Sequence, residues 1–244
     1  MEQLKLAFSN PYFLFGFAFL TIILVFVVVP MIRKIKDREL LNTVSSFKRG
    51  TPSERALIIQ MLKSGIPKQT LFHDLYFEKR DGAYAQIDAV LATTEGIIVF
   101  EVKDYSGWIF GDGGKTNWTQ VLAYGKRKYR FYNPIKQNLS HIRSLKRQLP
   151  QFRNIPFFSV ILFYGNCELK EITYVPDGTY IAKPHRLREV MREIKRNNVA
   201  APYTNKREVV EFLKEGVERG ADVEIQARHK LNIKDQLGKH RVYY

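Results

Sequence analysis

The chain reads Gln86-Ile87-Asp88-Ala89-Val90-Leu91-Ala92 and, after a short polar break, Ile97-Ile98-Val99-Phe100-Glu101-Val102-Lys103. Both segments are rich in aliphatic and β-branched residues, and the residues between them have the composition of a turn. They predict two antiparallel strands joined by a tight connection. Each strand is apolar on both faces toward one end, which is typical of central strands covered on both sides.

The loop length decides which charged side chains meet. Residues two apart in a strand face the same side, so Glu101 and Lys103 share a face. A four-residue loop at 93–96 places Asp88 opposite Glu101, whereas a two-residue loop at 95–96 places Asp88 opposite Lys103. In either register the three side chains lie on one face of the sheet.

Three charged groups beside an apolar interior need compensation, because unpaired buried charges cost several kcal/mol. One interpretation is a salt-bridge cluster at the strand ends, in which Lys103 neutralises the carboxylates. The other is a bound divalent cation, because Asp88 and Glu101 supply hard oxygen ligands. The pattern of these three residues alone leaves both interpretations open.

Two helices are predicted to bring further polar groups to this place. Thr51-Pro52-Ser53-Glu54 has the form of a capping box, so a helix begins there and Glu54 lies in its first turn. Glu54 could reach a metal site or could serve only the cap. Asn133-Pro134 begins another helix, and Gln137 lies one turn inside it. Gln137 could contact a phosphate, position a side chain, or simply be exposed.

The order of the elements (helix, three strands, helix, strand) predicts one α/β domain with a mixed central β-sheet flanked by helices. Helices are expected near 52–64, 134–149, 185–197 and 206–218, and strands at 70–77, 84–92, 97–103, 108–110, 118–124, 157–164, 173–175 and 179–181.

Five motifs then occur in order along residues 48–150: Gly50-x-x-x-Glu54, Gln86-Ile87-Asp88, Glu95-Gly96-Ile97-Ile98-Val99-Phe100-Glu101-Val102-Lys103, Gly107-Trp108-Ile109-Phe110-Gly111 and Asn133-Pro134-x-x-Gln137-Asn138. As an ordered set they resemble the nuclease-related domain (NERD) family, which is placed in the PD-(D/E)xK nuclease superfamily. The resemblance implies a restriction-endonuclease-like fold. Ile87 stands where the strict superfamily pattern has proline.

Carried over by position, the resemblance implies a catalytic set of Glu54, Asp88, Glu101, Lys103 and Gln137. Asp88 and Glu101 match the metal-ligand positions, with Glu54 as a further ligand, and the implied cofactor is Mg²⁺ or Mn²⁺. The implied activity is hydrolysis of phosphodiester bonds, and the implied partner is nucleic acid, DNA in preference to RNA. The alternative is a non-catalytic module that keeps the fold and binds nucleic acid, anionic lipid or a protein.

The charge balance also indicates a polyanionic partner. The formal net charge is +15, and residues 33–244 keep all of it because residues 1–32 hold one lysine and one glutamate. Nucleic acid and an anionic lipid surface both fit this charge. The run 126–132 mixes aromatic residues with the basic residues Lys126, Arg127, Lys128 and Arg130, and this mixture predicts nucleic-acid binding. An edge strand guarded by basic residues is the alternative.

Residues 11–32 are almost wholly apolar and would form about 33 Å of helix, enough to cross a ~30 Å hydrocarbon core. No small-x-small cleavage site follows them, which favours an anchor over a signal peptide. The basic residues Arg33, Lys34, Lys36 and Arg38 predict that the C-terminal side is cytoplasmic. Cys167 is the only cysteine, so no internal disulfide can form, in agreement with a reducing compartment.

The predicted organisation therefore has four parts: a transmembrane anchor at 1–32, a basic juxtamembrane connector at 33–49, a nuclease-like domain at 50–200 with its motifs in 50–150, and a C-terminal helix and basic tail at 201–244. The expected location is the cell membrane, crossed once, with the C-terminal domain in the cytoplasm. Oligomeric state has no sequence signal.

Overall fold

The computed structural model describes residues 11–79, 82–122 and 125–228. The chain divides into two compact units, residues 1–43 and residues 44–244. The first unit, where described, is helical: α2 (Pro11–Ile23), one π-helical turn, η1 (Leu24–Val28), and α3 (Val29–Asn42). The π turn directly precedes Pro30, which lacks an N–H and crowds the carbonyl four residues before it, so a local widening is expected there.

The stretch Leu14–Asn42 is long and apolar enough to cross a membrane, with a mean hydropathy of 2.8 in its most apolar window, and that window is not buried within the structure. This confirms the predicted long apolar helix near the N-terminus. Length and composition suit both a membrane span and a signal sequence.

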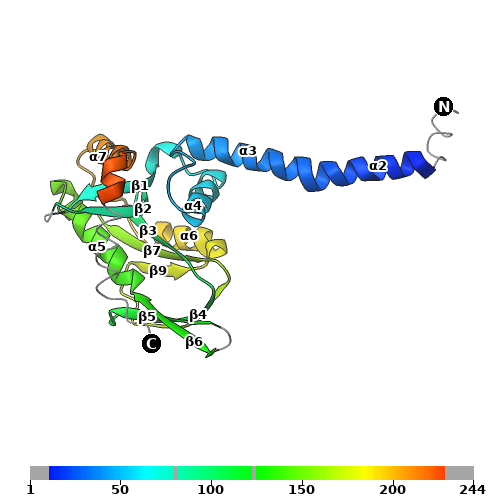
Figure 1. Cartoon of the computed structure of the whole chain (residues 1–244). Coiled ribbons are helices and arrows are strands. Elements are labelled where there is room, and N and C mark those ends of the chain that lie inside the picture. The colour runs from blue at the N-terminus through cyan, green and yellow to red at the C-terminus, as the bar shows by residue number, and fades with distance from the viewer. Residues whose placement is uncertain (1–10, 80–81, 123–124, 229–244) are drawn as a thin grey trace. The chain divides into compact units, whose positions relative to one another are not determined.

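The second unit contains a five-stranded sheet in the order β1-β2-β3-β7-β9 (Figure 1). Its first three strands pair antiparallel, and β7 and β9 continue the sheet parallel to β3. The predicted mixed central sheet is therefore confirmed. Its strands are β1 (Leu71–Glu78), β2 (Tyr84–Ala92), β3 (Ile97–Asp104), β7 (Phe157–Tyr164) and β9 (Thr179–Ala182).

A second, four-stranded sheet in the order β6-β5-β4-β8 was not expected from the sequence. Its strands are β4 (Gly107–Asp112), β5 (Asn117–Leu122), β6 (Arg127–Tyr132) and β8 (Cys167–Thr173). The short strand predicted at 173–175 is wrong, because β8 ends at Thr173. Figure 1 shows β4, β5 and β6 as a separate layer below the central sheet.

Two short crossings join the sheets. Tyr105 and Ser106 lead from β3 into β4, and Gly165 and Asn166 lead from β7 into β8. Because β3 pairs with β7 and β4 with β8, the two crossings run side by side. Gly165 has a φ of +69°, and a Cβ there would lie 2.4 Å from the Tyr105 carbonyl oxygen, so only glycine allows this close approach.

The main helices of this unit are α4 (Pro52–Lys63), α5 (Pro134–Lys146), α6 (Leu187–Asn197) and α7 (Lys206–Arg219), with short 3₁₀ turns η2 (Lys68–Thr70), η4 (Pro150–Arg153) and η5 (Pro184–Arg186). Helix α5 contacts β3 and β7, α7 contacts β1, and α6 contacts β9. The predicted domain boundary at residue 200 stays a prediction, but α7 beyond it packs on the sheet. The predicted basic tail lies largely in 229–244, outside the described residues.

Neighbouring strand residues show on which faces α4 and α5 lie. Ser53 of α4 hydrogen-bonds to Asp104, whereas Gln137 of α5 accepts a hydrogen bond from Lys103. Because adjacent residues of a strand face opposite sides, these contacts place α4 and α5 on opposite faces of the central sheet. The end of β3 is therefore flanked from both sides by the starts of two helices.

Candidate functional site

The β2–β3 hairpin has the four-residue loop, since Ala92 pairs with Ile97. The regular ladder ends at Ala89 and Phe100, and the next position of the same register sets Asp88 opposite Glu101. There the Asp88 carboxylate accepts a hydrogen bond of 2.7 Å from the Val102 backbone N–H. A side chain thus replaces the ladder bond at the point where the regular pairing stops.

Lys103 joins the strand cluster to α5. Its Nζ lies 2.6 Å from Oε1 of Glu101 and donates a 3.0 Å hydrogen bond to Oε1 of Gln137. The second Glu101 oxygen, Oε2, lies 3.5 Å from Nε2 of His141, four residues after Gln137 on the same helix. Glu101 is only 2% exposed, and the Lys103 ammonium group compensates its charge in the interior.

The sequence interpretation did not predict that His141 belongs to this cluster. The available signal was its position four residues after Gln137, because residues four apart share one face of a helix. A helix that directs Gln137 at Lys103 therefore directs His141 at the same cluster.

The two strand carboxylates have opposite pKa shifts. Burial, then the negative charges of Glu101 and Glu54, raise the pKa of Asp88 well above its usual range, and the Val102 N–H and Lys103 only partly oppose this. Burial alone would also raise the pKa of Glu101, but Lys103 and His141 outweigh it and hold that pKa below the ordinary value. Burial opposes the charge of Lys103, yet Glu101 and Asp88 raise its pKa. Glu101 and Lys103 therefore form the ion pair, and Asp88 is the carboxyl group whose negative charge the protein environment disfavours.

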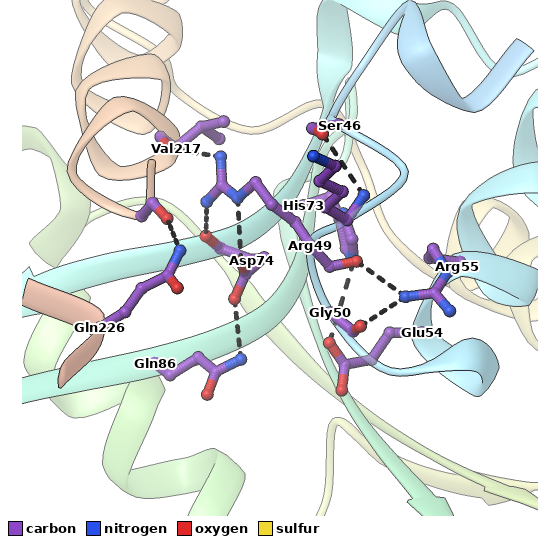
Figure 2. A network of polar contacts seen from close by, with 12 residues as sticks. Ser46, Arg49, Gly50, Glu54, Arg55, His73, Asp74, Gln86, Val217 and Gln226 are labelled. Atoms are coloured by element: carbon purple, nitrogen blue, oxygen red, sulfur yellow. Dashed lines mark hydrogen bonds and ion pairs between the residues drawn. The ribbon is translucent and has the colours of Figure 1, made fainter. Parts of the chain in front are cut away.

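Glu54 occupies the predicted place in the first turn of α4. The Thr51 hydroxyl accepts the Glu54 N–H and donates a 2.8 Å hydrogen bond to Glu54 Oε1, so the capping role is real. Oε2 makes no hydrogen bond among the described residues and lies 3.9 Å from Nε2 of the buried His73 (Figure 2). Burial, followed by the charges of Asp74 and Glu101, raises the Glu54 pKa despite Thr51.

An arginine holds the start of α4 against β1 and α7. Figure 2 shows Arg49 reaching Asp74 and the Val217 carbonyl, with distances of 2.9 Å from Nε to Asp74 Oδ2 and 2.7 Å from Nη1 to Val217 O. Gln86 donates a 2.7 Å hydrogen bond to the other Asp74 oxygen. Asp74 has a φ of 56°, unusual within a strand, and the ion pair with Arg49 fixes it there. None of these contacts could be predicted from sequence.

Comparison with known proteins agrees with this arrangement. A family model described as "Nuclease-related domain" (NERD) matches residues 49–164. Residues 49–164 are therefore similar to the nuclease-related domain family, and we call them the nuclease-related domain. It is also 30% identical over 152 residues to an uncharacterized protein of Bacillus anthracis, which covers 62% of this chain and 66% of that protein. No solved structure matches the chain.

The nuclease-related domain contains all five residues of the predicted catalytic set. The structure joins Glu101, Lys103 and Gln137 by direct contacts, and it holds Asp88 beside them. Glu54 comes from the other face of the sheet and interacts with the cluster through its charge. The catalytic roles of these residues stay predictions.

The donor set of the nuclease-related domain suits a hard cation with few protein ligands. Within 11–79, 82–122 and 125–228, no three His, Cys, Asp or Glu side chains gather closely enough to hold a metal ion, so Glu54 as a third ligand stays a prediction. Mg²⁺ is usually held by one or two carboxylates with waters. Asp88 and Glu101 supply these, and a cation would offset the burial and the neighbouring negative charges that raise the Asp88 pKa. The residues therefore fit Mg²⁺ or Mn²⁺.

The predicted nucleic-acid-binding residues lie on a different element. Arg127, Lys128 and Arg130 are exposed on β6, an edge strand of the second sheet, and Lys126 is exposed in the turn before it. Both the nucleic-acid interpretation and the edge-strand interpretation agree with this position. Trp118, by contrast, is 1% exposed and belongs to the core.

Proposed function

We propose that this chain is a membrane-anchored, divalent-metal-dependent nuclease-like enzyme that hydrolyses phosphodiester bonds of DNA, or of RNA, at the cytoplasmic face of the membrane. The observation that carries the proposal is the cluster in which Asp88 stands opposite Glu101 while Lys103 contacts Glu101 and Gln137. The nuclease-related domain supports a nuclease-like activity in general terms.

Each residue has a distinct task in this proposal. Asp88 and Glu101 would hold Mg²⁺ or Mn²⁺, which supplies polarisation of a phosphate oxygen and a lowered pKa of bound water. Lys103, fixed by Glu101 and Gln137, presents a permanent positive charge to the phosphate where negative charge develops. His141 positions Glu101 from the opposite side, and Glu54 adds negative charge from α4.

The test uses the full chain in detergent micelles with Mg²⁺ or Mn²⁺ and labelled DNA and RNA. We expect Asp88→Asn and Lys103→Met each to slow cleavage by about 10²–10³-fold, the usual effect of removing one charge-stabilising group. Asp177→Asn and Lys195→Met are matched controls, since both residues are exposed and far from the cluster in sequence. Absence of cleavage by the parent protein, or cleavage that survives both site substitutions, contradicts the assignment.

The second candidate is a binding module without turnover, favoured by the net charge of +15. It predicts nucleic-acid affinity that falls steeply with salt, because phosphate contacts release counterions. It also predicts that Glu101→Gln leaves this affinity unchanged and that no product forms at any metal concentration.

The anchor belongs to the same proposal. Residues 11–32 would cross the membrane once, and the four basic residues that follow would keep residues 33–244 in the cytoplasm. The nuclease-related domain would then act on nucleic acid that comes close to the inner membrane surface, and anionic lipid would contribute to its position there.

A further inference from the structure

The two faces of β6 lie in different environments. Partners across antiparallel strands share a face, and Phe131 pairs with Trp118 while Tyr129 pairs with Gln120. Phe131 packs against the core cluster that includes Trp118 and Phe163. Tyr129 and Arg127 therefore lie on the core-facing side of β6, beyond the edge of that core, and both are exposed. Tyr129 is 47% exposed.

The core-facing side of β6 leads to Lys103. Tyr105 follows Lys103 by two residues and lies in the crossing. The centroid of its ring lies 4.6 Å from the centroid of the Phe131 ring. The Lys103 ammonium group is close enough to interact electrostatically with the Tyr105 hydroxyl. Next to it, Gln120 donates a 2.8 Å hydrogen bond to the Ser106 carbonyl. Because Gln120 is the strand partner of Tyr129, the exposed tyrosine lies directly beside the crossing that leaves the cluster.

The side chains on this surface indicate which kind of ligand it would bind. We define the β6 track as Tyr105, Phe131, Tyr129 and Arg127. Aromatic rings that are open to solvent stack on bases, and only unpaired bases offer their faces, whereas guanidinium groups bind phosphates. A duplex keeps its base faces stacked on one another, and a lipid headgroup has no base face on which the ring could stack.

We propose that the β6 track binds single-stranded nucleic acid and guides its backbone toward Lys103, with a base stacked on Tyr129 and a phosphate on Arg127. The proposal rests on the proposed function for its end point, the site of cleavage. It names the substrate class of that site as a single strand rather than a duplex.

The opposite face of β6 supplies matched controls. Tyr132 and Arg130 are exposed on the same strand, Tyr132 to 50%, but their side chains point to the outer face of the second sheet. Tyr132→Ala therefore removes an equally exposed ring of the same type, and Arg130→Ala removes an equal charge. The two tyrosine substitutions change the net charge equally, and so do the two arginine substitutions. A difference in affinity within either pair therefore shows which face of β6 binds the nucleic acid.

The experiment measures binding of a labelled 20-nucleotide oligo-dT and of a duplex of equal length to the full chain in neutral-lipid nanodiscs. Chelator is present, so that no cleavage occurs. We expect Tyr129→Ala to weaken single-strand binding by about tenfold, the scale of one lost base stack, and Tyr129→Phe to restore it. Tyr132→Ala is expected to change it by less than about twofold, and Arg127→Ala to weaken it more than Arg130→Ala does.

Equal losses for Tyr129→Ala and Tyr132→Ala, or a preference for the duplex, would overturn the proposal. So would the lipid outcome, in which Tyr129→Ala leaves oligo-dT binding intact while Arg127→Ala lowers affinity for phosphatidylserine vesicles. Binding in chelator is independent of turnover. If binding depends on Tyr129 but the parent protein cleaves nothing, only the proposed hydrolysis is contradicted. If the parent protein cleaves nucleic acid but binding does not depend on Tyr129, only the role of the β6 track is contradicted.

Discussion

At the residue scale, Gly50 shows how closely the start of α4 is packed. Its φ is +65°, and a Cβ there would lie 2.5 Å from His73 Nε2 and 2.7 Å from Glu54 Oε2. We expect Gly50→Ala to lower the free energy of unfolding by about 2–4 kcal/mol, from backbone strain and from the clash together. Denaturant unfolding followed by tryptophan fluorescence would measure this.

Gly65 gives the control for that substitution. Its φ is +89°, but nothing lies within 4 Å of a Cβ placed there. Gly65→Ala should therefore cost only the backbone strain, about 1–2 kcal/mol. Equal costs for the two substitutions would mean that His73 and Glu54 move aside freely.

His73 makes stability depend on pH. Burial, followed by the charges of Arg49 and Arg55, lowers the pKa of His73 to about 3, and both ring nitrogens lack a hydrogen-bond partner among the described residues. The unfolded chain would take up a proton near pH 6.5, whereas the folded chain would not. Stability therefore falls as pH drops from about 6.5 toward 3, by up to about 1.4 kcal/mol per pH unit from this residue.

The substitution His73→Leu should remove that contribution. It should flatten the slope of unfolding free energy between pH 6.5 and 4 without lowering stability at pH 7, because no hydrogen bond of the imidazole is lost. His185→Gln, at an exposed histidine, should leave the slope unchanged. A slope that survives in His73→Leu would assign the acid sensitivity to the carboxylates instead.

At the element scale, α7 depends on a glycine for its contact with β1. Val209, Leu213 and Gly216 form its buried stripe, and a Cβ at Gly216 would lie 2.4 Å from the Phe77 ring, which is stacked on Phe212. Glycine inside a helix usually costs about 1 kcal/mol relative to alanine. Here we expect the reverse: Gly216→Ala should destabilise by about 1–3 kcal/mol, measured by thermal unfolding. Lys214→Ala, at the exposed face, should be neutral.

Elements with local signals could be predicted from the sequence, and those with distant partners could not. The even number of loop residues in the β2–β3 hairpin predicted that Asp88, Glu101 and Lys103 lie together. This prediction was possible because strand alternation and loop length are local properties. The second sheet was missed because β4 pairs with β8, which is far away in sequence and has weak strand character. The Arg49–Asp74 pair was likewise missed, since nothing in the sequence relates residues on separate elements. Gln137 was placed by its helix start, and His141 could have been placed by the same argument.

At the scale of the whole molecule, the orientation of the anchor can be tested directly. Cys167 is the only cysteine and is buried, so a cysteine introduced at exposed Asp177 would be the main accessible thiol among the described residues. We expect Asp177→Cys to be labelled by a membrane-impermeant maleimide only after the cells are opened, because in the proposed topology the basic flank would keep residues 33–244 inside. Labelling of intact cells would reverse the topology, and the parent protein is the control.

The paired crossings between the sheets have a consequence for the products of the proposed hydrolysis. Tyr105 and Ser106 tie the cluster to the second sheet, and the tight approach of Gly165 to Tyr105 leaves little freedom between them. A nucleic-acid strand with one base stacked on Tyr129 would then place its backbone at Lys103 a constant number of nucleotides away from that base. The domain would then cut at a fixed distance from the bound base, and digestion from a free end would yield fragments of one uniform length.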